Sequence, residues 1–377
     1  MSKTVFVYAG LLALSLGAAW VQYTGGEDEV KEGVLLLEAK AEQLEKVVYT
    51  SPDLTVTFEM KTDDFGRYGW AQVEDRKAKA KEGEPPPAPK VSTFKTGTAA
   101  DKLVEAFAPM MALRKLENVD DTQLTSFGLK EPDSTVAVTS GGKTMTLSLG
   151  GETYGTKDRY AKDQASGAIY VIDDEPFKTL KFAGTRLPER ALVAGKVETI
   201  ESVTLGVGGT NVTWTQKNKD DKAAAYWERE GATGKDETMS NWVDKALKLK
   251  STSYVQADET PAELVPAFDL TVRAAGSKPE TLQLLQGGED WYAKSESTRG
   301  LVKLSRGPAK DAAEDAKDVV EGRTPPPDET PAAPAGDAPG GPGGPGGPGG
   351  PGGPGGPGGP GHGRPPGLPP GMMPKPG

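Results

Sequence analysis

Three groups of neighbouring acidic residues are the places in this sequence where side-chain chemistry is conceivable. Two carboxylates can serve as general acid and base in glycoside hydrolysis when their environments separate their pKa values. None of the groups has the spaced aspartates of a calcium loop. All are expected in turns, where aspartate accepts hydrogen bonds from nearby backbone. We therefore favour turn residues over catalytic ones at Asp63-Asp64, Asp120-Asp121 and Asp173-Asp174-Glu175.

The residues needed for most other catalytic chemistry are missing. The chain has no cysteine, and its single histidine, His362, lies in a Gly/Pro-rich stretch. A Ser-His-Asp triad, a cysteine nucleophile, a disulfide and an imidazole-based zinc site are thereby excluded from the folded part. The glycine-rich segments 150–155 and 206–209 lack the Lys-Ser/Thr pair or the following helix of a nucleotide-binding loop. We expect no enzyme, no cofactor and no metal site.

Composition narrows the class of protein further. The chain has 377 residues and a formal net charge of −10, so a basic surface for nucleic acid is not expected. Glycine and proline number 49 and 32, which means that much of the chain cannot belong to a packed core. The length leaves room for two domains once the two ends are set aside.

The N-terminal region, residues 1–26, has the pattern of a membrane anchor. Residues Thr4 to Tyr23 carry no charge and follow Lys3. Twenty helical residues span a hydrocarbon core of about 30 Å, and Trp20 and Tyr23 suit its outer interface. The alternative is a cleaved signal peptide. We expect a single-pass protein of the bacterial inner membrane, with a cytoplasmic N-terminus and a periplasmic body.

Small residues within this segment offer a face for close packing against membrane helices of a partner. They are Gly10, Gly17 and Ala18.

The body repeats its pattern about 155 residues apart. Leu44–Val48 is similar to Ile200–Thr204, and a helical pattern over 98–116, interrupted by Pro109, corresponds to another over 240–250. Each copy is predicted to be an α+β module, β-β-α followed by an antiparallel meander, with the helix on one face of the sheet. The predicted boundaries are 34–180 with a Pro-rich insertion over 75–97, a linker over 181–196, a second copy over 197–310, and a short charged segment over 311–323.

The C-terminal region, residues 324–377, is dominated by a Gly-Gly-Pro repeat and lacks the apolar content to offset chain entropy. We expect a disordered tail. A flexible spacer, a collagen-like trimer and a proline-rich docking tail are alternatives. The docking alternative depends on Arg364, Leu368, Pro369 and Pro370.

One series of short motifs resembles a known family. The order is Thr125-Ser126-Phe127-Gly128-Leu129-Lys130-Glu131-Pro132, then Val136-Ala137-Val138, Leu147-Ser148-Leu149-Gly150-Gly151-Glu152-Thr153, Tyr160 and Ile169-Tyr170-Val171-Ile172. This series is similar to the DUF4340 type of N-terminally anchored bacterial envelope proteins. Gly128 and Pro132 read as turn and strand-entry residues. The resemblance implies an accessory subunit of an ABC transporter of the gliding-motility type, and supplies no catalytic residues.

The functional expectation combines these observations. The leading hypothesis is a membrane-anchored periplasmic scaffold of an ABC transporter-type envelope complex, with the permease and ATPase as partners, serving gliding motility or type IV pilus assembly. The alternative is a free envelope module that binds glycan or peptide, and a carboxylate-based hydrolase is a third.

Overall fold

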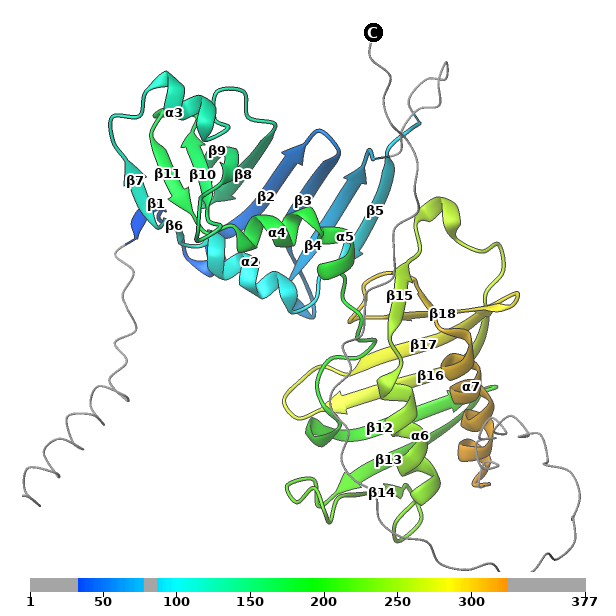
Figure 1. Ribbon diagram of the computed structural model, residues 1–377. Coiled ribbons are helices and arrows are strands. Elements are labelled where there is room, and N and C mark those ends of the chain that lie inside the picture. The colour runs from blue at the N-terminus through cyan, green and yellow to red at the C-terminus, as the bar shows by residue number, and fades with distance from the viewer. Residues whose placement is uncertain (1–32, 78–86, 324–377) are drawn as a thin grey trace, which may run out of the picture. The chain divides into compact units, whose positions relative to one another are not determined.

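The computed structural model describes residues 33–77 and 87–323. We call residues 33–187 the first lobe and 188–323 the second, and their order along the chain can be followed by colour in Figure 1. The strands of these residues form antiparallel sheets of nine, eight and two strands. The nine-stranded sheet of the first lobe has the order β5-β4-β3-β2-β8-β9-β10-β11-β7. Its strands are β2 (Leu44–Ser51), β3 (Leu54–Asp63), β4 (Gly66–Asp75), β5 (Lys90–Lys95), β7 (Arg114–Leu116), β8 (Ser134–Ser140), β9 (Lys143–Glu152), β10 (Arg159–Asp163) and β11 (Ile169–Ile172).

Alternation of apolar and polar residues gives this sheet one buried face. In β3, Leu54, Val56 and Phe58 are buried, and the threonines between them face the other side. Helices α2 (Ala99–Phe107) and α4 (Glu175–Lys181) pack together, with the rings of Phe107 and Phe177 5.9 Å apart at 70°. Figure 1 shows both helices against the sheet. The core of the first lobe therefore lies between these helices and one sheet face.

Smaller elements complete the first lobe. β1 (Val34–Leu37) pairs with β6 (Met110–Ala112) in the two-stranded sheet. The short helix α3 (Asp121–Ser126) begins at Asp120, whose side chain accepts the Gln123 N–H at 2.8 Å. The remaining helical segments are η1 (Ala41–Gln43) and α5 (Ala183–Arg186).

The eight-stranded sheet of the second lobe has the order β14-β13-β12-β16-β17-β18-β19-β15. This order repeats β4-β3-β2-β8-β9-β10-β11-β7 position by position, and β5 has no counterpart. Its strands are β12 (Ile200–Val207), β13 (Thr210–Lys217), β14 (Tyr226–Arg229), β15 (Ser251–Tyr254), β16 (Val265–Ala274), β17 (Glu280–Gly287), β18 (Asp290–Ser295) and β19 (Val302–Leu304), with short helices η2 (Val197–Thr199) and η3 (Ala257–Glu259).

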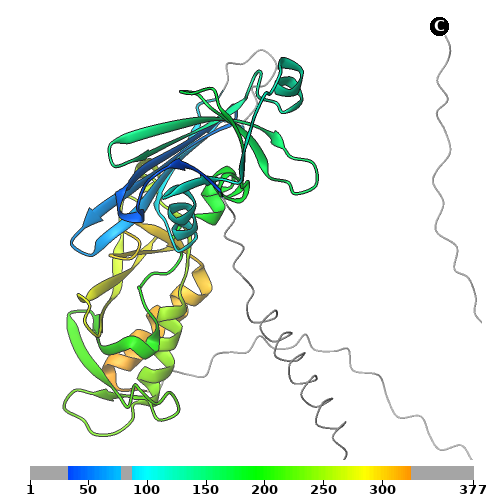
Figure 2. The same ribbon diagram turned by 90° about the vertical axis from the view of Figure 1, so that its left-hand side faces the viewer.

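Two helices cover one face of this second sheet. They are α6 (Glu237–Lys248) and α7 (Arg306–Glu321), and they run beside each other in Figures 1 and 2. The Trp242 indole N–H donates to the Ala312 carbonyl at 2.8 Å, and Lys245 pairs with Asp315 at 3.2 Å. The helices therefore pack as a pair through a buried hydrogen bond as well as apolar contact.

The structure corrects the predicted fold class. The α+β assignment, with units of β-β-α and a meander, is wrong because strands predominate in three antiparallel sheets. Four strands of the large sheet precede α2 and three strands precede α6, where two were expected, and a strand after the helix closes the far sheet edge as β7 or β15. The units are thus mostly β-sheet.

Several predicted boundaries also need correction. The predicted insertion over 75–97 includes a strand, β5, because Lys90–Lys95 pairs with β4. The predicted linker over 181–196 contains α5, and the short charged segment over 311–323 belongs to the longer helix α7. The helix expected over 98–116 ends at Phe107.

The predictions for the two ends of the chain concern residues outside the described ranges. These are the membrane anchor over 1–26, with Thr4, Trp20, Tyr23, Gly10, Gly17 and Ala18, and the tail over 324–377, with Arg364, Leu368, Pro369 and Pro370. Within residues 33–77 and 87–323, every helix is too short or too polar to traverse a lipid bilayer.

Candidate functional site

A cavity of about 690 Å³ opens where the motifs of the first lobe meet. Strand β2 and its turn contribute Tyr49 and Asp53, and the segment after α3 contributes Gly128 and Glu131. The end of β9, the start of β10 and helix α4 complete the wall with Leu149, Gly150, Gly151, Glu152, Arg159, Asp174, Phe177, Lys178, Lys181 and Phe182. We call this space the motif cavity.

Backbone contacts between two motifs shape one wall of the motif cavity. The Gly151 N–H donates to the Phe127 carbonyl at 2.8 Å. A Cβ on Gly150 would lie 2.2 Å from that carbonyl oxygen, so only glycine fits. Gly128 has a φ of +69°, which lets the chain turn beneath β9. Gly150 thus allows close backbone approach, and Gly128 lies in a turn, as predicted from the sequence.

A buried ion pair lies at the base of the motif cavity. The Arg159 Nε–H donates to Oδ1 of Asp174, and the Arg159 Nη1 group donates to the Gly150 carbonyl at 2.6 Å. The Asp174 side chain is 2% exposed. Its Oδ2 makes no directional hydrogen bond within the described chain but lies 3.2 Å from Lys178 Nζ. Both oxygens are therefore held by cations, which compensates for burial of the charge.

Tyr49 is the second buried polar group on this wall. Burial raises the pKa of its phenol, and hydrogen bonds to Ser51 and Ser134 and the Arg159 charge partly oppose that rise. The phenol therefore stays protonated at neutral pH and can donate a hydrogen bond.

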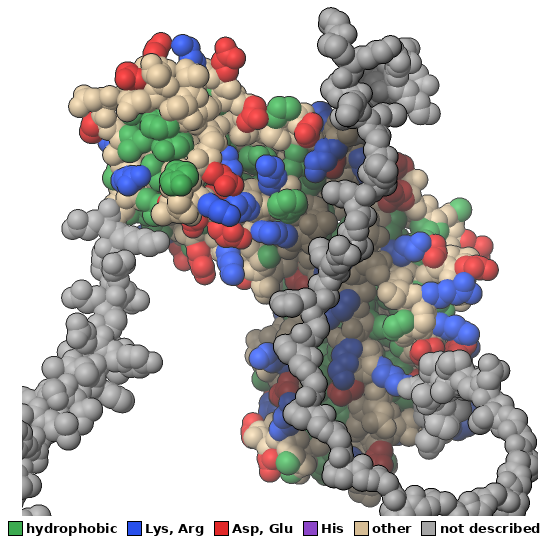
Figure 3. Space-filling view, viewed as in Figure 1, with side chains coloured by type: hydrophobic (Ala, Val, Ile, Leu, Met, Phe, Trp, Pro, Cys, Tyr) green, Lys and Arg blue, Asp and Glu red, His purple; other side chains and the backbone are tan. Residues whose placement is uncertain are grey.

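Charge at the mouth of the motif cavity is unevenly distributed. Four exposed carboxylates line it, and no ion pair within the described residues engages them: Asp53, Glu131, Asp133 and Glu152. Lys181, also without such a pair, and Phe182, 51% exposed, lie at the α4 edge. Acidic and basic side chains are otherwise interspersed over the surface in Figure 3. The mouth is therefore mainly acidic, with one basic and aromatic edge.

The three acidic groups of the sequence occupy separate places in the described structure. Asp63, Asp120 and Asp173 each accept a nearby backbone N–H, from Phe65, Gln123 and Glu175, at 2.8, 2.8 and 3.0 Å. These carboxylates serve turns and a helix cap. Asp63 is also ion-paired, with Arg299 at 2.7 Å, but its side chain is partly exposed. Asp174 differs because its ion-paired side chain is buried.

The sequence contained a partial signal for the site. The motif glycines, Glu131 and Glu152 belong to the motif series, but the pairing of Arg159 with Asp174 was missed. That pairing depends on how β10, β11 and α4 pack together, and a local sequence pattern does not predict such packing.

The side chains of the motif cavity indicate which kind of ligand it could recognise. Histidine and cysteine are absent from the described residues, and the buried carboxylate is locked by Arg159 and Lys178. The described residues also contain no group of three or more potential ligands placed to hold a metal ion. Charged and aromatic groups around an open cavity instead suit recognition of a polar ligand.

Comparison with known proteins assigns a family but no activity. The model of the family described as Domain of unknown function (DUF4340) matches residues 97–267, which include most of the motif cavity wall. Over these residues the chain belongs to the DUF4340 family. No curated protein matches the chain.

Proposed function

We propose that this protein is a non-enzymatic docking subunit of a bacterial envelope assembly and that its motif cavity binds a partner segment carrying a basic side chain. The observation that carries the proposal is the set of four exposed carboxylates, none of them ion-paired among the described residues, around a cavity of about 690 Å³. A lysine or arginine entering this mouth would find opposite charge at its rim and the Tyr49 hydroxyl and Gly150 backbone deeper in.

The internal ion pair supports a docking role in a second way. Arg159 and Asp174 already satisfy each other, so a ligand does not have to supply a charge at the base of the cavity. The cavity is thus preformed, and binding would cost little reordering of its wall.

The wider context of the proposal is the cell envelope. The charge-free segment Thr4–Tyr23 supports attachment to the inner membrane with a periplasmic body. The family resemblance supports an ABC transporter permease or ATPase as partner. In that arrangement the body would hold a partner next to the transporter.

Site-specific photocrosslinking in the native cell tests the proposal. A photoreactive amino acid at Glu131 should capture one defined partner, identified by mass spectrometry, and the same residue at the exposed Asp258 of the second lobe provides the control. Capture of an envelope protein from position 131 alone is the expected result. Equal capture from both positions, or capture of cell-wall glycan alone, would overturn it in favour of non-specific contact or a free glycan-binding module.

A further inference from the structure

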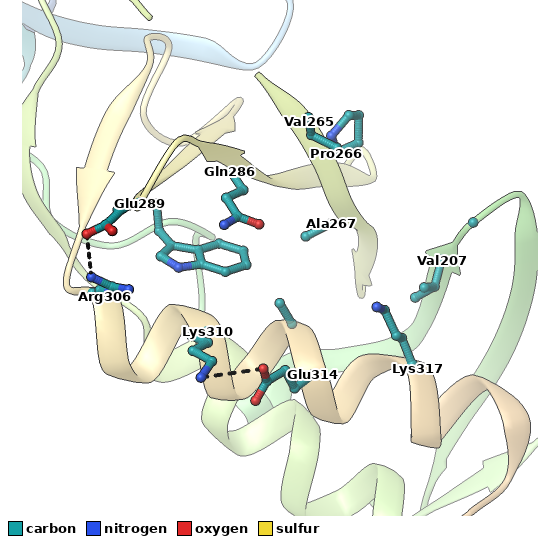
Figure 4. Close-up of a pocket in the computed structure, with 13 residues that line it drawn as sticks. Val207, Val265, Pro266, Ala267, Gln286, Glu289, Arg306, Lys310, Glu314 and Lys317 are labelled. Atoms are coloured by element: carbon teal, nitrogen blue, oxygen red, sulfur yellow. Dashed lines mark hydrogen bonds and ion pairs between the residues drawn. The ribbon is translucent and has the colours of Figure 1, made fainter. Parts of the chain in front are cut away.

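A second cavity, of about 440 Å³, lies between α7 and the first residues of β16 in the second lobe. We call it the α7 groove. Figure 4 shows Val265, Pro266 and Ala267 of β16 on one side and the charged side chains of α7 on the other. Its lining residues differ from those of the motif cavity, so a ligand bound here would be a second one.

The wall of the α7 groove is apolar between its charged edges. Trp291 and Ala313 are 6% and 5% exposed, so they belong to the core and present only a small part of their surface to the groove. Val265, in contrast, is 54% exposed. The volume lies within the range of about 300–1,000 Å³ that is usual for ligand sites. The groove can therefore cover apolar side chains of a bound segment.

The edge of β16 that borders the groove is open. On one side β16 pairs with β17 from Val265 onward, whereas on the other side β12 pairs with it only from Asp269 to Ala274. β12 ends at Val207, and Gly208 then turns the chain with a φ of +58°. Within the described residues, Val265–Ala267 thus has no strand beside it on the β12 side. An extended peptide can lie along such an open strand edge.

The charged edge of the α7 groove has three basic and two acidic side chains. Arg306 pairs with Glu289 at 2.9 Å and Lys310 with Glu314 at 3.6 Å, and all four side chains are more than half exposed, so both pairs are weak. Lys317 has no ion pair among the described residues, and Figure 4 shows it extending from α7 toward β16. The charge therefore favours an acidic occupant.

The spacing of the basic side chains gives the length of this occupant. Arg306, Lys310 and Lys317 follow one another at four and seven residues, which places them along one side of the helix over about 16 Å. An extended chain of about five residues has the same length. We propose that the α7 groove binds an extended segment of a partner protein in which acidic residues accompany apolar ones.

The proposed segment lies along the open edge of β16, with its carboxylates on Lys310 and Lys317 and an apolar side chain against Trp291. It is opposite in charge to the segment proposed for the motif cavity. The two sites therefore select different segments, and neither proposal depends on the other.

Selection from a random peptide library tests this site without knowledge of the partner. Linear peptides displayed on phage are selected on the full-length protein, and the enriched peptides are synthesised for affinity measurements. We expect enriched peptides that combine acidic with apolar residues. Lys310→Glu with Lys317→Glu should bind them about tenfold more weakly. Lys250→Glu with Lys294→Glu makes the same charge change at exposed positions of the second lobe outside the groove and should bind them as the native protein does.

A second variant tests the apolar wall. Val265→Ser changes an exposed side chain and should also weaken binding of the same peptides, and circular dichroism checks that each variant is folded. Three results would overturn the proposal: no enrichment of acidic peptides, equal loss of binding in the two lysine variants, or unchanged binding to Lys310→Glu with Lys317→Glu. Peptides that lose binding only to Glu131→Lys with Asp133→Lys report on the motif cavity, so the two proposals fail separately.

Discussion

The ring of Tyr160 stacks on the ring of Phe127, with centroids 4.0 Å apart and planes inclined by 13°. The two residues come from different motifs of the family series, and the Phe127 carbonyl also accepts the Gly151 N–H. The loop after α3 is therefore attached to β9 through backbone and to β10 through side chains. This double attachment holds one wall of the motif cavity.

The stacked pair should be energetically coupled. In a double-mutant cycle of Phe127→Ala and Tyr160→Ala, we expect a coupling free energy of about 0.5–1.5 kcal/mol, because each single change removes the same ring contact. Urea unfolding of the four proteins measures it. Additive effects of the two changes would show that the rings contribute independently.

Gly150→Ala should destabilise the first lobe. The new Cβ would lie 2.2 Å from the Phe127 carbonyl oxygen, so the backbone of one motif must move. We expect a loss of about 1–3 kcal/mol in unfolding free energy. Gly184→Ala is the matched control because its Cβ meets no atom within 4 Å, and an unchanged Gly150→Ala protein would refute the close approach.

Asp174→Asn should lower the free energy of unfolding more than the loss of the Lys178 side chain does. Asparagine leaves the partly buried Arg159 without its counter-charge, at a cost of about 3 kcal/mol. Lys178→Met removes a half-exposed partner and should cost less than about 1 kcal/mol. The double change Arg159→Met with Asp174→Leu should recover much of the stability that Asp174→Asn loses. Calorimetric unfolding of the three variants measures these differences. Equal effects of Asp174→Asn and Lys178→Met would contradict the assignment of Arg159 as the main partner.

Asp163 should contribute to acid sensitivity. Burial tends to raise the pKa of this carboxyl, but hydrogen bonds from the Ser166 hydroxyl and the N–H groups of Ala165 and Ser166 outweigh it and lower the pKa. A depressed pKa in the folded state gives stability that is present above about pH 4 and is lost as pH falls through the folded value. Asp163→Asn should therefore flatten the decline of the urea midpoint below about pH 4. An unchanged acid decline would show that other groups cause it.

Strand alternation could be predicted from sequence, whereas helix extent was predicted less well. The apolar positions of β3 follow a period of two and lie on the buried face. After Phe107, Pro109 interrupts the helical pattern, and Met110–Ala112 pairs instead with β1. Helix α7 was underestimated because four of its six buried residues are alanines, which give weak hydrophobic contrast among charged neighbours.

The site was predictable only in part. The motif glycines indicate turns or close approach between two backbone segments, because few other residues permit either. The ion pair at the base of the motif cavity joins residues 15 positions apart, and three packed elements set its geometry. The rim carboxylates come from the turn after β2, the segment after α3 and the end of β9, so their proximity is a property of the fold.

Recovery of the native partner by a rim charge-reversal variant tests the docking claim most directly. Glu131→Lys with Asp133→Lys places two positive charges at the mouth, and Asp258→Lys with Glu263→Lys makes the same net change at exposed positions of the second lobe. Crosslinked complexes from native cells are quantified by mass spectrometry at matched protein levels. The account predicts loss of a partner with the first variant and full recovery with the second. Unchanged recovery with the first variant would contradict binding of a basic segment in the motif cavity.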